Sequence, residues 1–320
     1  MKTIVVLTDF SKNARLAAEA ALTLAPEIGA NILLFHAYMR SQYVPSLSNT
    51  GWPAECFSSF QADSKKALKE EVKHLENIRI ERNLSPNVID ITYLNSEGTL
   101  IENVPMLLKK YDTSFILMGG RTKKSGDLIF GNDIQDVVNK ANCPVLIVPE
   151  ETTSLEYKNI AFATDLSKGD IAPLKWLMKF ADGFKAKINI CHVSKPVADI
   201  TDFSNEDLIY SFVNETVKMH KENISFTDIM GTHIVEELEK FRMEKHQDLL
   251  VLVYKKHSIF WRMFHESPAR NFIQQQKGPI LILPEDRIDN EVIASAKVKF
   301  VNQKNNVYTY SNLEIYRFIL

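Results

Sequence analysis

The chain has few of the residues that build disulfide frameworks or structural metal sites. Its 320 residues include three cysteines, Cys56, Cys143 and Cys191, which lie far apart and have no metal-binding spacing. An odd number of widely separated cysteines is typical of proteins from a reducing compartment. We therefore predict a protein without disulfides and without a metal site.

Long hydrophobic runs are also missing. No apolar stretch approaches the roughly 20 residues that a membrane-spanning helix needs. The first apolar run, Ile4 to Leu7, is soon followed by Asp9, which is unlike a signal peptide. The formal net charge of -2 gives no indication of a nucleic-acid or acidic-lipid partner. These absences predict a soluble cytoplasmic protein with no nucleic-acid and no membrane partner.

A repeat is the main positive feature of the sequence. Residues 5–13 read VVLTDFSKN and residues 161–169 read AFATDLSKG, so that Asp9 and Asp165 stand 156 positions apart. Near the end of each copy the offset is 135, because CPVLIVPE at 143–150 matches GPILILPE at 278–285. The first copy therefore holds 21 more residues in its middle. A period of this length indicates a duplicated domain rather than a solenoid.

Each copy alternates short apolar runs with helical stretches. Continuous apolar runs are typical of parallel strands that are buried on both faces. One run in each copy alternates instead, as an edge strand does: Val88–Tyr93 and Ile224–Thr227. Five strands in each copy predict an α/β fold of two tandem, doubly wound, Rossmann-like parallel-sheet sandwiches. The continuous runs are Ile4–Leu7, Ile32–Phe35, Phe115–Met118, Val145–Val148, Ile160–Ala163, Ile188–Cys191, Leu249–Val253 and Ile280–Leu283.

The repeat divides the chain into two domains and a tail. We place the first domain at 1–150, the second at 157–285, and a C-terminal extension at 286–320. The extension contains two alternating stretches, which predict a hairpin arm that extends or covers a sheet edge. An insert at 38–57 is either a lid over the pocket of the first domain or a plain surface loop.

The repeated aspartate has two interpretations. In open α/β sheets, ligands bind beyond the carboxyl ends of the strands, where Asp9 and Asp165 are expected. Such a carboxylate accepts hydrogen bonds from a ribose or a base, or else it holds the turn by bonds to the backbone. Residue type alone favours the turn. Ser11 and Ser167 are the predicted N-caps of the helices that follow.

Glycine is scarce and unevenly placed. The chain has 11 glycines, and four of them lie within the thirteen positions 119–131, after the fourth predicted strand. Glycine lets backbone N–H groups approach an anion, and a helix predicted from Asp133 would favour a phosphate at its N-terminus. The alternative is a surface loop whose basic residues are solvated. The second copy has no glycine from Thr232 to Lys277, so we expect no nucleotide there.

Together these residues resemble the universal stress protein family in its tandem two-domain form, over about residues 1–285. The resemblance implies a parallel sheet in the order 3-2-1-4-5 and a homodimer, commonly formed through the last strands. A tandem chain could instead place its own two last strands side by side. The motifs that carry the resemblance are Thr8–Ser11, Thr164–Ser167, His36–Ala37, His192–Val193, the Met118–Gly119 loop and Cys143–Pro149.

Members of this family divide into ATP binders and non-binders. The sequence departs from the binders' loop, because Thr122 replaces a glycine, Asn132 replaces Ser or Thr, and the loop is one residue short. Leu7 stands where a proline is common. The resemblance implies ATP in the first domain, with Mg²⁺ held through its phosphates, and no cofactor in the second. The implied site consists of Thr8, Asp9, Ala37, Met118, Gly119, Gly120, Lys123, Gly126, Gly131 and Asn132.

Catalytic residues are not apparent beside the glycine-rich loop. The sequence shows no nucleophile–base pair, metal triad or paired carboxylates there, so we assign no catalytic residue and predict that the protein is not an enzyme. Two hypotheses remain. The protein is a stress-response protein that binds ATP in its N-terminal domain, or it is a nucleotide-free dimeric scaffold for unidentified protein partners. Saturation of a nucleotide titration separates them.

Overall fold

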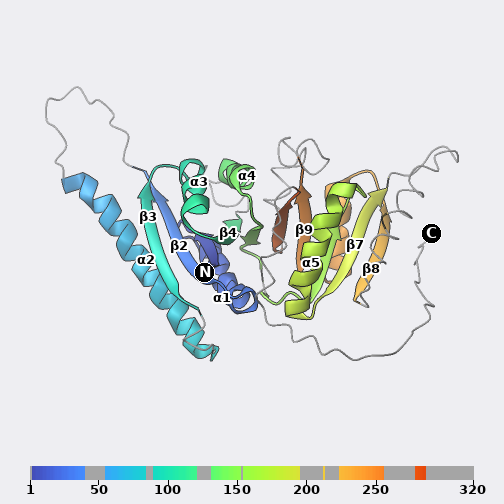
Figure 1. Cartoon of the computed structure of the whole chain (residues 1–320), viewed down its shortest axis with the longest axis horizontal. Helices are drawn as coiled ribbons and strands as arrows, with labels where there is room; N and C mark the ends of the chain where they lie inside the picture. Colours follow the sequence, from blue (N-terminus) through green and yellow to red (C-terminus); the bar gives the residue numbers. More distant parts are fainter. Residues whose placement is uncertain are drawn as a thin grey trace, which may run out of the picture.

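A computed structural model describes most of both repeat copies (Figure 1). The predicted hairpin arm at 286–320, the insert at 40–54 and the loop at 121–130 lie outside the described residues, as does the segment 256–277. Predictions for these segments stay predictions. The described residues are 2–39, 55–83, 89–120, 131–152, 154–194, 212, 223–255 and 278–285.

The described strands form one sheet in the order β3-β2-β1-β4-β5-β10-β9-β6-β7-β8. Neighbouring strands are parallel within each half, and both halves follow the order 3-2-1-4-5, as the resemblance implied. The predicted fold class is therefore confirmed. The first half contains β1 (Thr3–Leu7), β2 (Asn31–Tyr38), β3 (Ile91–Glu97), β4 (Thr113–Gly120) and β5 (Val145–Pro149). The second half contains β6 (Asn159–Ala163), β7 (Lys187–Ser194), β8 (Ile224–Met230), β9 (Leu249–Tyr254) and β10 (Ile280–Pro284).

The outer strands of the sheet are the two that alternate in sequence. β3 and β8 each pair on one side only and are partly exposed, whereas every residue of β1 and β5 is buried. The alternation placed the first edge strand at Val88–Tyr93, but β3 begins at Ile91. Pairing starts there because Ile91 is the partner of Ile32, at the start of β2.

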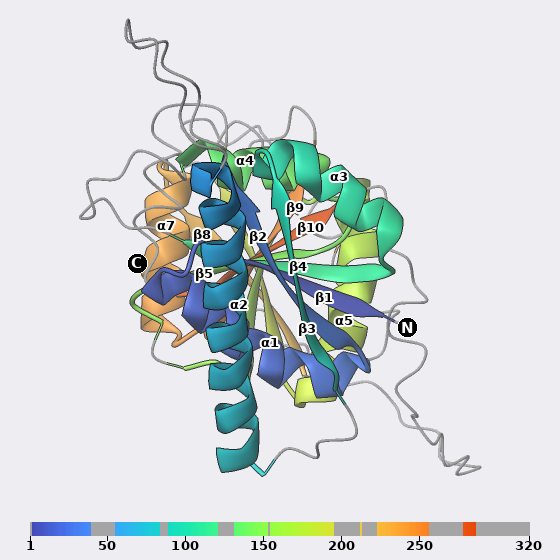
Figure 2. The same cartoon turned by 90° about the vertical axis from the view of Figure 1, so that its left-hand side faces the viewer.

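The two halves meet at an antiparallel seam between β5 and β10. Leu146 lies opposite Leu281 in this seam, so the last strands of both halves pair within one chain. The seam continues into the core, where the ring of Phe115 on β4 lies 5.6 Å from that of Trp176 in the second half. One sheet thus runs through both halves (Figure 2), and one apolar core cluster contains residues from both.

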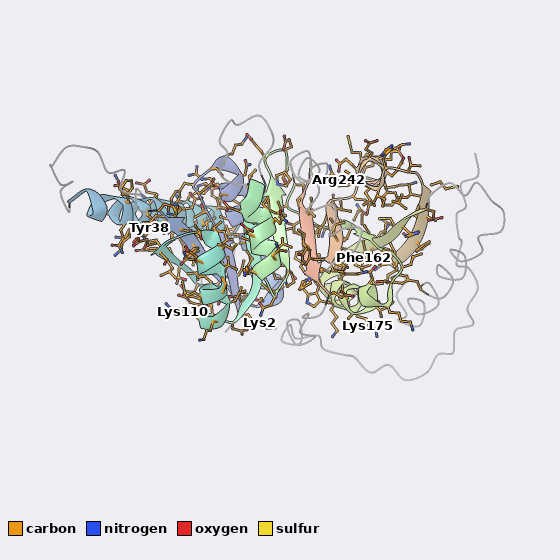
Figure 3. All side chains as sticks on the ribbon, turned by 90° about the horizontal axis from the view of Figure 1, so that it is seen from above. Lys2, Tyr38, Lys110, Phe162, Lys175 and Arg242 are labelled. Carbon is orange, nitrogen blue, oxygen red and sulfur yellow. The ribbon has the colours of Figure 1, made fainter. Side chains whose placement is uncertain are left out.

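Helices cover both faces of the sheet, as Figure 3 shows from above. α1, α2 and α5 pack on one face, and α3, α4 and α7 pack on the other. Among the described helices, none combines the length and the apolar composition needed to cross a lipid bilayer. The helices are α1 (Lys12–Ile28), α2 (Glu55–Glu81), α3 (Leu100–Lys110), α4 (Gly131–Lys140), α5 (Ile171–Phe184) and α7 (Ile234–Glu244).

The first helix of each half starts differently. Ser11 caps α1 as predicted, because its Oγ accepts a hydrogen bond from the backbone N–H of Ala14 at 3.3 Å. The prediction for Ser167 is wrong, since Ser167 precedes a 3₁₀ turn, makes no side-chain cap, and α5 begins only at Ile171. Its Oγ instead accepts a hydrogen bond from Nζ of Lys255 at 2.5 Å.

Candidate functional site

A pocket of about 190 Å³ lies at the carboxyl ends of β1, β2 and β4. This is the edge of an open α/β sheet where ligands bind, next to the point at which the strand order reverses. The loops before α1 and α3 and the first turn of α4 complete its walls. Its lining consists of Leu7, Thr8, Asp9, Ser11, Ala14, His36, Ala37, Met39, Gly98, Thr99, Leu100, Met118, Gly119 and Asp133.

The Thr-Asp-x-Ser sequence forms a tight turn at the floor of this pocket. Oγ1 of Thr8 accepts a hydrogen bond from the N–H of Phe10 at 3.0 Å, and Phe10 has a φ of 64°. Oδ1 of Asp9 accepts hydrogen bonds from the N–H and the Oγ of Ser11, at 3.0 and 2.5 Å. Asp9 therefore holds the turn, as one of its two interpretations predicted, and it also lines the pocket.

The backbone of Ala37 faces the pocket. The carbonyl of Phe35 accepts from the N–H of Thr8 on the β1 side, and the carbonyl of Tyr38 accepts from Gly98 on the β3 side. Alternate residues of a strand direct their backbone groups to opposite neighbours, so Ala37 directs its N–H and C=O toward β1. Because β1 ends at Leu7, these two groups reach the open end of the sheet. A donor and an acceptor from one residue suit the edge of a planar base.

Gly119 has a packing role that the sequence did not reveal. A Cβ at this position would lie 2.6 Å from the N of Ala14 and 2.7 Å from the C of Asn13. The side chain of Asn13 also donates a hydrogen bond to the carbonyl of Gly120 at 2.5 Å. The glycine thus lets β4 approach the first turn of α1. The sequence had predicted a glycine there for the approach of a phosphate.

The far wall of the pocket comes from two helix starts. Thr99 caps α3 in a reciprocal capping box with Glu102, which holds the loop at Gly98 against the pocket. Asp133 lies in the first turn of α4, which begins two residues earlier than the predicted start. Sequence reasoning missed Gly98, Thr99 and Asp133 as lining residues, although the Thr-x-x-Glu pattern at 99–102 is a recognisable capping signal.

His36 connects the pocket to α2. Its Nδ1 lies 2.8 Å from Oγ of Ser64, which also accepts a hydrogen bond from Asn95 at 3.1 Å. The ring of Phe10 lies 4.5 Å from the His36 ring. Burial lowers the pKa of His36, against the opposing effect of the Asp9 charge. Burial at this position therefore favours the neutral form of the His36 imidazole.

The second half contains the same turn but not the same space. Oγ1 of Thr164 accepts from the N–H of Leu166 at 2.9 Å, and Oδ1 of Asp165 accepts from the N–H of Ser167 at 3.1 Å. The cavity beside this turn measures only about 20 Å³. Nζ of Lys255 lies 2.6 Å from Oδ1 of Asp165.

A second carboxylate completes this cluster. Oδ1 of the fully buried Asp170 lies 2.6 Å from Nζ of Lys255, and its Oδ2 accepts from Oγ1 of Thr164 at 2.6 Å. Burial raises the pKa of Asp170 to about 6, although the Lys255 charge opposes the change. Burial would also raise the pKa of Asp165, but the hydrogen bond and the charge of Lys255 outweigh it and lower this pKa.

The structure brings together five of the ten predicted site residues: Thr8, Asp9, Ala37, Met118 and Gly119 line the pocket. Gly120 lies one residue beyond, with its backbone bonded to Asn13. Gly131 and Asn132 form the start of α4, whereas Lys123 and Gly126 lie outside the described residues. Within the described part of the chain, no three His, Cys, Asp or Glu residues are grouped to hold a metal ion.

The sequence of the chain is similar to that of a known protein family. Residues 1–149 match the model of the universal stress protein family. Over 148 residues the chain is 31% identical to the Thermus aquaticus protein named universal stress protein in QAH/OAS sulfhydrylase 3'region, covering 98% of that protein and 46% of this chain.

Solved structures agree on the fold. A universal stress protein from Archaeoglobus fulgidus matches with a TM-score of 0.63 at 16% identity, covering 88% of this chain and 96% of that one. A putative universal stress protein from Pseudomonas aeruginosa matches with a TM-score of 0.52 at 11% identity, covering 91% of this chain and 95% of that one. On the family-model match and the Thermus aquaticus relative, the chain belongs to the universal stress protein family.

Proposed function

We propose that this protein is a non-catalytic stress-response protein that binds an adenine nucleotide, such as ATP, in the pocket of its first half. The observation that carries the proposal is the open pocket of about 190 Å³ beside Asp9, against about 20 Å³ beside Asp165. The turns themselves are alike, so the difference in space separates the two halves. The second half is proposed to hold no nucleotide.

The groups around the pocket suit a nucleoside. The N–H and C=O of Ala37 complement the acceptor N1 and the donor N6 of adenine, and the carboxylate of Asp9 accepts a hydrogen bond from a ribose hydroxyl. Leu7 and Met118 supply apolar walls. The volume is below the ~300 Å³ at which ligand pockets usually begin, so it suits the base and ribose alone. The phosphates would then extend toward the N-terminus of α4, at Gly131 and Asn132, with Mg²⁺ bound to them.

Calorimetric titration of the nucleotide-stripped chain with Mg-ATP tests the proposal. We expect saturable binding at one site per chain. Asp9→Ala should weaken it by about tenfold or more, since a hydrogen bond to a charged group contributes about 1.5–3 kcal/mol. Asp165→Ala is the matched control, because it disturbs the same turn in the other half and should leave affinity within about twofold. Absence of heat at millimolar Mg-ATP, or equal losses in both variants, would refute the proposal.

A nucleotide-free scaffold remains the second candidate function, and the β5–β10 seam is the observation that favours it. The seam gives one rigid sheet with two outer strands, β3 and β8, which is suited to presenting surfaces to partners. This function would be supported if the chain does not bind nucleotide but does bind protein partners at β3 or β8.

The expected homodimer needs a surface other than the last strands. In this chain β5 and β10 already pair with each other, so that edge is used internally. We therefore propose that any homodimer forms through another face. Light scattering after size exclusion, over a hundredfold range of concentration, measures the mass: 36.5 kDa throughout would exclude the dimer.

A further inference from the structure

His36 and His192 hold corresponding positions in the two halves, but their rings are bonded to different kinds of group. They stand 156 positions apart on β2 and β7, and each lines the cavity beside the turn of its own half. Nδ1 of His36 lies 2.8 Å from Oγ of Ser64, whereas Nδ1 of His192 lies 2.9 Å from the carbonyl oxygen of Thr164. A neutral imidazole has one N–H donor and one acceptor nitrogen, so the bonded partner decides which nitrogen carries the proton.

The partner of His192 decides its tautomer directly. A carbonyl oxygen can only accept, so Nδ1 of His192 carries a proton and donates it to Thr164. In the neutral ring Nε2 is then unprotonated. The second half therefore presents an acceptor nitrogen at the remaining edge of this ring.

The partner of His36 is a hydroxyl, which can donate or accept, so its tautomer depends on the next residue in the network. Nδ2 of Asn95 donates to the carbonyl of Gln61 at 3.0 Å, and a reversed amide would set its oxygen against this carbonyl. The same Nδ2 donates to Oγ of Ser64 at 3.1 Å. Ser64 is buried, and among the described residues its hydroxyl has one acceptor within reach, Nδ1 of His36.

This network places the proton of His36 on the opposite nitrogen from that of His192. A buried hydroxyl without an acceptor costs free energy, so the O–H of Ser64 donates to Nδ1 of His36. Burial also lowers the pKa of His36, which favours the neutral ring with its proton on Nε2. Nδ1 is directed to α2, and no described residue is hydrogen-bonded to Nε2. Because the ring lines the pocket, its Nε2–H is a donor that a ligand can use.

We propose that His36 is a specificity-determining residue of the first pocket, which donates a hydrogen bond from Nε2 to N3 of a purine nucleoside. This deepens the proposed function and rests on it for the placement of the base. There Ala37 takes the N1 and N6 edge of adenine, which leaves N3 and N7 as ring acceptors. The charge of Asp9, the proposed partner of the ribose, acts on the His36 ring, and N3 is the acceptor on the ribose side. His192 would set an acceptor against N3, so the second half disfavours the same ligand.

Nitrogen-15 NMR of the full chain at pH 8 measures both tautomers, because protonated and unprotonated imidazole nitrogens have well-separated shifts. The chain has eight histidines, so His36→Phe and His192→Phe assign the signals by their loss. We expect the proton on Nε2 of His36 and on Nδ1 of His192. Asn95→Asp should move the proton of His36 to Nδ1, because a carboxylate accepts the O–H of Ser64, whose Oγ then accepts from the ring. The same tautomer in both histidines, or a His36 proton that stays on Nε2 in a folded Asn95→Asp variant, overturns the proposal.

Calorimetry with three nucleosides tests the contact to the ligand. 3-Deazaadenosine replaces N3 by C–H, and 7-deazaadenosine makes the same change at N7 and is the matched control. We expect 3-deazaadenosine to bind about fivefold more weakly than adenosine, the effect of one neutral hydrogen bond, and 7-deazaadenosine to bind within about twofold. In His36→Phe, adenosine and 3-deazaadenosine should bind alike. Equal affinities of the wild type for all three, or a preference that persists in His36→Phe, overturns the role of His36.

The proposed function and the role of His36 fail in different ways. A chain with the expected tautomers that binds none of the three nucleosides would refute nucleotide binding and the contact to N3. The opposite tautomers of the two halves would still stand. Binding of adenosine without a weaker binding of 3-deazaadenosine would refute the role of His36 alone.

Discussion

The two halves of this protein share a turn and differ in what stands beside it. In both, a threonine and an aspartate hold the turn by accepting hydrogen bonds from backbone N–H groups, and the residue after the aspartate has a positive φ. In the first half a pocket opens next to this turn. In the second, Lys255 and Asp170 form ion-paired contacts beside the turn, and the cavity there measures only about 20 Å³. A motif that survives duplication can therefore keep its hydrogen-bonded turn, while residues that are distant in sequence change what lies beside the turn.

A second difference lies where β4 and β9 meet the first helix. Gly119 allows β4 to touch the first turn of α1, whereas its counterpart, Val253, is fully buried. The first helices also start differently: α1 begins at Lys12, whereas in the second half a 3₁₀ turn from Lys168 precedes α5, which begins at Ile171.

The largest expected effect comes from removing the charge of Lys255. Lys255→Met should lower the free energy of unfolding by about 3–5 kcal/mol at pH 8, because the buried carboxylate of Asp170 and the partly buried carboxylate of Asp165 lose their partner. Burial raises the pKa of Asp170 to about 6, so the folded state holds this proton more tightly than the unfolded state. The stability that Asp170 contributes is thus present at low pH and is lost as pH rises through 6. The loss caused by Lys255→Met should therefore be smaller at pH 5, in urea unfolding at both pH values. An equal loss at both would contradict the assigned ionisation.

A comparable but smaller loss is expected from making the first half resemble the second at the strand end. Gly119→Val should cost about 3 kcal/mol, since the new Cβ meets backbone atoms of α1 that have no room to move. Gly183→Ala is the control, because the nearest atom to its new Cβ is 3.5 Å away and glycine is unfavourable within α5. It should be neutral or stabilising in urea unfolding. If both variants behave alike, the packing explanation of Gly119 fails.

Replacing the cap of α1 should have an intermediate effect. Ser11→Ala removes the side-chain acceptor for the N–H of Ala14 and should cost about 1 kcal/mol of stability. The same change loosens Asp9, which accepts from Oγ of Ser11, so thermal unfolding and nucleotide affinity should fall together. A fall in stability with unchanged nucleotide affinity would show that the N-cap of α1 does not contribute to binding in the pocket.

The smallest effect is expected at an exposed ion pair between α1 and the residue that follows β5. Lys12 and Glu150 lie 3.3 Å apart with side chains 72% and 45% exposed. Lys12→Met should change the free energy of unfolding by less than about 0.5 kcal/mol at either pH. Compared with Lys255→Met, this variant measures how much burial amplifies the loss of one lysine charge.

Sequence reasoning was most successful where the hydrophobic pattern is strong. All eight continuous apolar runs became strands, and the helix start at Ser11 was correct. It failed at Ser167, where the residue type is the same but Lys255 takes the hydroxyl. It also placed β3 three residues early, because pairing with β2 rather than alternation fixes where the strand begins.

By itself, the sequence determined the repeat, the parallel five-stranded plan of each half and the likeness of the two turns. These follow from local apolar runs and from hydrogen bonds within four residues, which depend only on residues that are close together in the sequence. Only the tertiary structure decided that the two last strands pair, that Gly119 serves packing, and that Lys255 meets Asp165 from 90 residues away. The physical reason is that burial and ion pairing depend on which distant segments the fold brings into contact, and local pattern carries no information on that contact.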